Sequence, residues 1–390
     1  MLTRLLIAIA CCGLFASRLL GAEQQQQKMS GPYTQDNLTI YLVHGPGAVH
    51  GDYLTLEEAL AAKKVIVHET GNVNELAIEN QSDMPVYVQS GDIVKGGRQD
   101  RTIGVDIVLA PHSQKIPIAS FCVEHGRWTQ RGSEPATQFE SASGIVAGPK
   151  MKLAANANYK GGEQQKVWDE VAQSQRKLAM NVARPAAEAV PPAVAPAATP
   201  PPAQPATPPN ADINAPAQQV ASAGSAGSAR SAVSAGNTSV DGLFGGSGGS
   251  FQLTLENKDV TAAVDKYVEK LKSVADDKDD AIGYVAVVNG KVSCSDVYGS
   301  TEMFKKLWPR LLRSAATEAA AEKKADAKFE PLSEQGVHNA LLGAEDGKVS
   351  EKDVNERTKC TTIESANKVL FITRDQKAEG VLHRSILPKE

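Results

Sequence analysis

The chain has 390 residues, 42% of them hydrophobic, and a formal net charge of −4 at pH 7. This nearly balanced charge provides no field that would attract nucleic acid or an anionic membrane surface, so we expect no nucleic-acid partner. Length alone predicts two or three domains. However, Ala, Pro, Gly and Ser dominate residues 185–249 and give a hydrophobic core no anchor, so the composition indicates fewer domains.

The N-terminus has the pattern of a signal peptide over residues 1–22. Arg4 supplies the positive flank, residues 5–15 form a short apolar run, and small residues at Gly21 and Ala22 offer a cleavage site. The alternatives are an uncleaved anchor and lipid attachment at Cys11 or Cys12. The pattern predicts a secreted or periplasmic protein whose mature chain has no transmembrane segment.

Residues 23–35, which include four consecutive Gln, are expected to form a flexible leader. Order is expected from a strand at residues 38–43. Thr55 and Glu58 have the spacing of a capping box, which predicts a short helix ending at Ala62.

Short strands are expected next, because apolar runs are bounded by Gly, Asn, Asp or Pro at intervals of about ten residues. Their ranges are 65–69, 75–79, 86–90, 103–109 and 116–123. This spacing predicts an antiparallel sandwich or a barrel-like core rather than alternating strands and helices. An apolar stripe at helical spacing predicts a helix over residues 164–182.

A long low-complexity insertion covers residues 185–250, where the composition predicts a disordered linker. Beyond it, an apolar face predicts an amphipathic helix over residues 260–275. Asn289-Gly290 predicts a hairpin between strands at 283–288 and 291–297. Ser300 is expected to cap a helix that Pro309 kinks or divides, and residues 368–373 and 381–387 are expected to form a closing hairpin.

The fold class is therefore α+β: a β-rich antiparallel core with several packed helices. Residues 36–184 and 251–390 are interpreted as two parts of one domain, because neither part alone has a complete set of core residues. Two independent domains are the alternative. Cys122, Cys294 and Cys360 remain after cleavage, and either Cys122 pairs with Cys294 or all three are buried free thiols.

A polar segment at residues 90–101 is the first candidate site, because glycines let a ligand approach the backbone and the cationic side chains supply donors. Its candidate ligand-binding residues are Lys95, Gly96, Gly97, Arg98, Gln99, Asp100 and Arg101. The alternative is a glycine-rich turn whose charges are solvated or paired with one another.

A second segment, residues 122–128, adds Glu124, Arg127 and Trp128 to the candidate ligand-binding residues. Glu124 could instead form a buried ion pair with Arg98 or Arg101. The neighbouring carboxylate disfavours Cys122 as a nucleophile. The histidines lack the spacing of a metal site, so no metal is expected.

These two segments together resemble the signature of the ARG and rhodanese-phosphatase-superfamily-associated protein domain family. The likeness continues through residues 166–168, 283–290 and 304–314. The resemblance implies one split domain and a candidate surface, and it implies no reaction, substrate or cofactor.

Three functions are expected from these observations. The first is a non-enzymatic exported module that binds a polar or anionic small molecule or a glycan. The second is a hydrolase in which Glu124 and Asp100 act as acid and base. The third is a structural or adhesion role in the cell envelope. The cofactor and the oligomeric state stay open. All three interpretations depend on the two polar segments meeting in the folded chain.

Overall fold

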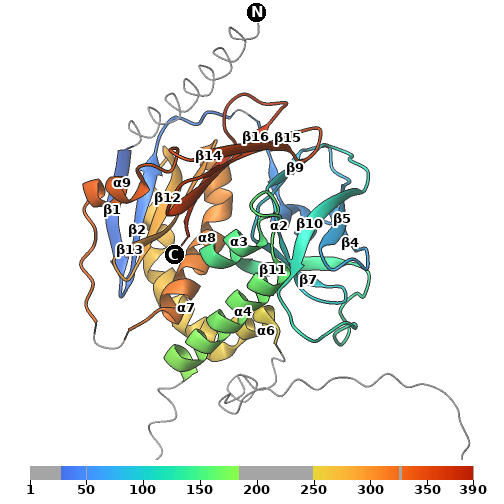
Figure 1. The fold of residues 1–390 in the computed structure, drawn as a ribbon, viewed down its shortest axis with the longest axis horizontal. Coiled ribbons are helices and arrows are strands. Elements are labelled where there is room, and N and C mark those ends of the chain that lie inside the picture. Colours follow the sequence, from blue (N-terminus) through green and yellow to red (C-terminus); the bar gives the residue numbers. More distant parts are fainter. Residues whose placement is uncertain (1–27, 50, 184–248, 325–326, 390) are drawn as a thin grey trace, which may run out of the picture.

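A computed structural model describes residues 28–49, 51–183, 249–324 and 327–389. The fold is α+β with antiparallel sheets, one of which is a nearly closed, barrel-like sheet. The expected fold class is thus confirmed. Figure 1 shows the barrel-like sheet on one side of the molecule and a larger sheet with its helices on the other.

The larger sheet has eight strands, and every neighbouring pair is antiparallel. In spatial order these are β1 (Lys28–Gln35), β2 (Leu38–His44), β12 (Ala281–Val288), β13 (Lys291–Tyr298), β17 (His383–Pro388), β16 (Lys368–Asp375), β15 (Thr358–Glu364) and β14 (Lys348–Asp353). Since β2 pairs with β12, the two parts of the chain on either side of the insertion contribute strands to one sheet.

The barrel-like sheet has six strands, all from the first part of the chain. They are β11 (Phe139–Val146), β7 (Asp92–Gly96), β8 (Arg101–Ile103), β10 (Ile116–Cys122), β5 (Glu75–Asn80) and β4 (Val65–Glu69). A backbone bridge from His68 in β4 to Gln138, next to β11, brings the two edges together. A small third sheet contains β3 (Leu54–Thr55), β6 (Val86–Val88) and β9 (Ile107–Leu109).

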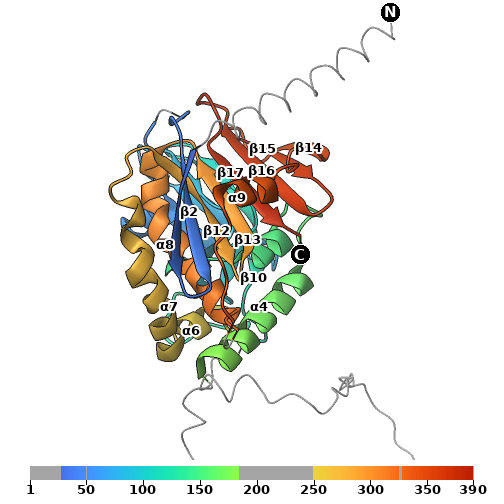
Figure 2. The ribbon, with the colours of Figure 1, turned by 90° about the vertical axis from the view of Figure 1, so that its left-hand side faces the viewer.

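The helices cover both faces of the larger sheet and one side of the barrel-like sheet. They are α2 (Leu56–Ala61), α3 (Pro149–Ala155), α4 (Gln164–Leu178), α6 (Phe251–Glu256), α7 (Lys258–Leu271), α8 (Thr301–Ala321) and α9 (Glu334–Leu341), with a π-helical turn, η1 (Ala179–Ala183), and a 3-10 turn, η3 (Lys272–Ala275). Figure 2 shows α9 against one face of the larger sheet. On this face, Val337 and Leu341 pack with strand residues such as Val285, while the core on the other face includes residues of α7 and α8.

Most of the expected elements are confirmed. Thr55 and Glu58 form the predicted capping box at α2. The Asn-Gly hairpin joins β12 to β13, and Asn289 and Gly290 both have the positive φ angles that this turn requires. Pro309 lies inside α8, which continues to Ala321, so the expected alternative that Pro309 divides this helix was wrong.

Other expectations were wrong. Residues 28–35, expected in the flexible leader, form β1, because pairing with β2 satisfies their backbone. The polar segment 90–101 is not a simple loop, since it contains all of β7 and the first residue of β8. The strand expected at 103–109 is divided into β8 and β9 by a bend at residues 104–106.

The N-terminal signal pattern and residues 185–248 of the low-complexity insertion lie outside the described residues. The described chain resumes at Gly249, and Ser250, which we had included in the linker, is buried and caps α6. Among the described helices, none combines the length and the apolar character needed to cross a membrane.

Candidate functional site

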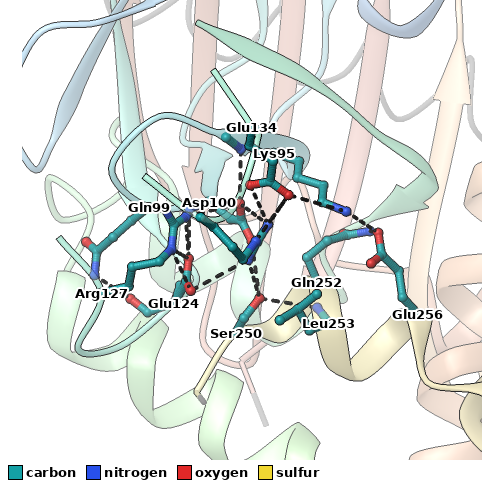
Figure 3. Close-up of polar contacts among 12 residues, drawn as sticks. Lys95, Gln99, Asp100, Glu124, Arg127, Glu134, Ser250, Gln252, Leu253 and Glu256 are labelled. Carbon is teal, nitrogen blue, oxygen red and sulfur yellow. Dashed lines mark hydrogen bonds and ion pairs between the residues drawn. The ribbon is translucent and has the colours of Figure 1, made fainter. Parts of the chain in front are cut away.

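The two polar segments meet in the folded chain. The segment at residues 90–101 forms β7, a turn and the start of β8, and Glu124 follows the end of β10, which pairs with β8. The Gln99 side-chain amide donates to the Glu124 carbonyl oxygen at 3.0 Å, and the Asp100 N–H donates to the Glu124 carboxylate at 3.3 Å. Figure 3 shows these residues gathered at one end of the barrel-like sheet, beside the start of α6.

Their charges are paired with one another. Both Arg131 Nη atoms donate to Asp100, at 3.0 and 3.1 Å, and Arg127 Nε lies 2.8 Å from each oxygen of Glu124. The Ser250 hydroxyl also donates to Asp100 at 3.2 Å. We call Asp100, Glu124, Arg127, Arg131 and Ser250 the ion-pair cluster. It makes the charge-assisted contacts that buried carboxylates need.

Glu124 is a buried partner in ion pairs, but its partners are not the expected ones. It pairs with Arg127 and, at 3.6 Å, with Arg131 rather than with Arg98 or Arg101. Arg101 points instead toward Cys122 and the Val73 carbonyl oxygen, because Arg101 and Cys122 are paired residues of β8 and β10. Arg98 lies in the turn, where its N–H donates to Glu69.

The other predicted ligand-binding residues also contact protein groups. Lys95 Nζ lies 2.7 Å from Glu256, and the Gly96 N–H donates to Asp100 at 3.1 Å. A Cβ atom at Gly97, where φ is +54°, would lie 2.3 Å from the Phe139 ring. These glycines therefore allow close packing of the backbone against β11.

Trp128 is an exposed residue of the predicted set, with 40% of its surface accessible. The guanidinium carbons of Arg98 and Arg101 lie 5.6 and 5.5 Å from its ring centre, which is cation–π distance. The geometry thus gives the predicted segments a structural role. A backbone bridge between Glu124 and Ser250 fastens the second part of the chain to the first.

A separate polar pocket lies where the barrel-like sheet, the larger sheet and α3 meet. It contains about 370 Å³ of unfilled space, including its mouth. Its walls are formed by Ser90, Asp106, Lys152, Asn156, Asn158, Cys360, Phe371, Thr373, His383, Ser385 and Leu387. We call this cavity the polar pocket.

His383 in β17 lies between two carboxylates in the wall of the polar pocket. Its Nδ1 is 2.7 Å from Asp106 and its Nε2 is 3.1 Å from Asp296. Burial alone would lower the pKa of His383, but the two carboxylates raise it to about 9. Burial would raise the pKa of Asp296, yet Lys152 and His383 lower it below its ordinary value. At neutral pH His383 is therefore an imidazolium between two carboxylates.

Lys152 of α3 enters the polar pocket through a gap that glycine provides. The Lys152 side chain crosses Gly91, where φ is +93° and a Cβ atom would lie 2.8 Å from Lys152 Cγ. Lys152 is only 5% exposed. Its Nζ lies 3.6 Å from Asp296 and makes no hydrogen bond with any residue that the structure describes. A buried ammonium with unused donors lines the pocket.

Further polar groups in the pocket wall lack partners. Ser90 Oγ and Asn158 Oδ1 are buried and have no hydrogen-bond partner in the described part of the chain. Buried polar groups are normally paired, so these atoms need a ligand or water. The polar pocket thus presents the donors of Lys152 and Ser90 together with the acceptor of Asn158.

The three cysteines in the described ranges are free and buried, so the pairing of Cys122 with Cys294 was wrong and the alternative is correct. Burial raises the pKa of Cys122 to about 11 and that of Cys360, which lines the polar pocket, to about 12. Neither thiol is activated for nucleophilic attack. Within the described ranges, no three His, Cys, Asp or Glu side chains are grouped as metal ligands would be.

Sequence reasoning missed the residues that build the polar pocket. Asp296 and His383 lie within the strands expected at 291–297 and 381–387, and a titratable residue inside a predicted strand is the signal that could have found them. Lys152 gives no such signal, because the position of its side chain in the pocket depends on how α3 packs against Gly91.

The fold and the site define an α+β protein with a polar pocket at the junction of two β-sheets. The chain belongs to the ARG and Rhodanese-Phosphatase-superfamily-associated Protein domain family, whose sequence model matches residues 26–387. This match confirms the resemblance carried by the two polar segments. Neither the search of curated proteins nor the search of solved structures found a match.

Proposed function

We propose that this protein is a binding module for a small polar or anionic molecule, which occupies the polar pocket beside Lys152. The observation that carries the proposal is the buried Lys152 ammonium, which lines the pocket and has no hydrogen bond within the described residues. The ammonium faces Asp296 at 3.6 Å, a distance that leaves its three donors for a ligand. A ligand anion would accept from those donors.

The pocket wall indicates the chemistry of the ligand. Carboxylate or phosphate oxygens would accept from Lys152 and Ser90, and a ligand hydroxyl would donate to Asn158 Oδ1. Phe371 and Leu387 offer an apolar surface to a short carbon skeleton. The polar pocket is small, which favours a short molecule such as a hydroxy acid or one sugar unit bearing an acid group.

The charges around the pocket are balanced. The positive charges of Lys152 and His383 face the carboxylates of Asp106 and Asp296. Affinity for an anion would therefore come from short hydrogen bonds rather than from a long-range positive field. Selection among anions would depend on the placement of the hydroxyl that reaches Asn158.

The proposal includes export, which rests on the signal pattern at residues 1–22. No observation favours hydrolysis by Glu124 and Asp100, because Arg127 and Arg131 hold their carboxylates. Ligand binding by Trp128 also stays a prediction, and its ring already contacts two guanidinium groups. No contact among the described residues supports or opposes a structural or adhesion role in the cell envelope.

The proposal is tested by thermal shift and calorimetry with a panel of hydroxy acids, phosphorylated sugars and neutral sugars. We expect at least one acid to bind the wild-type protein, and Lys152→Met to weaken that binding at least tenfold. Lys150→Met is the matched control, because Lys150 is an exposed residue of the same helix outside the polar pocket. Equal affinity in wild type and Lys152→Met, or a neutral sugar binding as well as its acid, would contradict the proposal.

A further inference from the structure

A second cavity lies among α3, α4, α8 and the start of α6. Figure 1 shows these helices close together on the side of the barrel-like sheet that faces α8. The cavity contains about 580 Å³ of unfilled space, including its mouth, and we call it the helix cavity. No described residue that lines it also lines the polar pocket.

The interior of the helix cavity is mostly apolar. Met151 of α3, Leu178 of α4 and Phe251 of α6 line it and are themselves buried. Ile145 and Val146 of β11 complete this lining. The cavity therefore offers a contact surface to an apolar group, which gains free energy by leaving water.

Two carboxylates line the helix cavity without an ion pair. Glu318 of α8 accepts a hydrogen bond from the Ser293 hydroxyl at 2.6 Å, and Glu170 of α4 makes no hydrogen bond or ion pair within the described residues. Burial raises the pKa of both carboxyl groups above the ordinary value. Two lysines also line the cavity: Lys177 is paired with Glu322, while Lys150 is exposed, makes no ion pair in the described chain and partly opposes the effect of burial on both carboxyl groups.

Ser314 of α8 is an independent sign of a missing partner. It is only 7% exposed, it lines the helix cavity, and its hydroxyl has no hydrogen-bond partner in the described chain. Two carboxylates without an ion pair and a serine hydroxyl around an apolar space are the complement of a donor-rich, positively charged group on an apolar body.

We infer that the helix cavity binds a small apolar molecule that carries a protonated primary amine, with the ammonium between Glu170 and Glu318 and the apolar body against Leu178 and Phe251. The ammonium supplies three donors, and the available acceptors are the two carboxylates and the Ser314 hydroxyl. This site is independent of the proposed function, because it uses different residues and recognises the opposite charge.

The test compares benzylamine with its neutral analogue benzyl alcohol, using calorimetry on the full chain at pH 7. We expect benzylamine to bind at least tenfold more tightly than benzyl alcohol. Glu318→Gln and Glu170→Gln should each remove most of this preference. Asp169→Asn is the matched control, because Asp169 neighbours Glu170 on α4 but does not line the cavity.

A second variant guards against a loss of folding in the charge variants. Ser174→Leu places a larger side chain at a partly exposed position of α4 that lines the cavity, and it should abolish benzylamine binding while the thermal transition stays cooperative. The inference is overturned if benzylamine does not bind, if the alcohol binds equally well, or if a folded Glu318→Gln or Ser174→Leu protein binds benzylamine like the wild type.

Discussion

Asp100 and Glu124 stabilise the structure because each buried carboxylate faces a guanidinium group. Arg131 holds Asp100 through two hydrogen bonds, and Arg127 holds Glu124 through its Nε. Burying such charges is tolerated only when they are paired, and removing one partner leaves the other charge uncompensated. The contribution of the ion-pair cluster to the free energy of unfolding is therefore measured mainly by removing one of its partners.

We predict that Glu124→Gln lowers the free energy of unfolding by about 3 kcal/mol, because Arg127 loses the negative charge it binds. Urea denaturation measures this loss. Glu256→Gln is the control, since the Glu256 side chain is 39% exposed and its pair with Lys95 should contribute less than about 1 kcal/mol. Equal effects of the two substitutions would show that the ion-pair cluster has no special role.

The meeting of the two polar segments was predictable from their residues, but the outcome of that meeting was not. Arg131, which provides two of the main contacts to Asp100, lies outside both segments. Arg127 and Arg131 both lie in the loop between β10 and β11, and the path of this loop decides which carboxylate each arginine reaches. A loop path leaves no periodic pattern in the sequence.

At the scale of elements, strong local signals were sufficient and weak ones were not. The Asn-Gly hairpin and the amphipathic helix α7 combine a clear apolar period with recognisable turn or cap residues. In contrast, β7 is rich in Gly and charge, and α3 has only seven residues, so neither has a pattern that stands out. Both elements are stabilised by tertiary packing. β7 supplies residues of the first polar segment, and α3 supplies Lys152 to the polar pocket.

His383 connects elements that are distant in the chain. It contacts Asp106 in the bend between β8 and β9, Asp296 in β13, and Tyr298, whose ring centre lies 4.6 Å away in a stacked arrangement. Tyr87 of β6 also lies within hydrogen-bond distance of Nδ1, at 3.0 Å. The protonation of one imidazole therefore affects the junction of the barrel-like sheet with the larger sheet.

We predict that stability falls as the pH rises from about 6.5 through 9. The folded-state pKa of His383, about 9, lies above the ordinary value of 6.5, so the folded protein binds the proton more tightly than the unfolded chain. The stabilisation is complete below pH 6.5 and is lost as the pH passes the folded-state pKa. Tyr87, Tyr298 and Cys360 do not titrate in this range, because their pKa values are raised above it.

Urea midpoints measured between pH 6 and 9.5 check this pH dependence. In a folded His383→Gln protein the decline should be much smaller, and the acid limb should also weaken, because His383 helps to lower the pKa values of Asp106 and Asp296. A decline of the same size in this variant would assign it to other groups.

At the scale of the whole molecule, the larger sheet joins both parts of the chain. Asn37 donates to Asn289 at 3.0 Å across a sequence separation of 252 residues, and β2 pairs with β12 along its whole length. The two described ends that flank residues 184–248 are also fastened, since Gln175 of α4 donates to the Ser250 carbonyl oxygen at 3.2 Å. The described contacts thus hold the two parts together without the insertion.

We predict that a Gly-Ser linker of about 20 residues, with a root-mean-square span of about 25 Å, can replace residues 185–248 without loss of the fold. Because the loop becomes about threefold shorter, the loop-closure entropy should favour the folded state by about 1 kcal/mol. Thermal unfolding and the ligand panel described above measure the outcome. Loss of the cooperative transition would mean that the insertion itself stabilises the fold.

The pairing of β2 with β12 has a consequence for how the chain reaches its native state. A growing polypeptide releases β1 and β2 early, but their neighbour in the sheet is synthesised only after the insertion and α7. Until then, β2 carries an unpaired apolar edge, which is prone to association with other chains. The six strands of the barrel-like sheet all lie in the first part, so they can assemble in the meantime, and completion of the larger sheet would be the slow event of folding during synthesis.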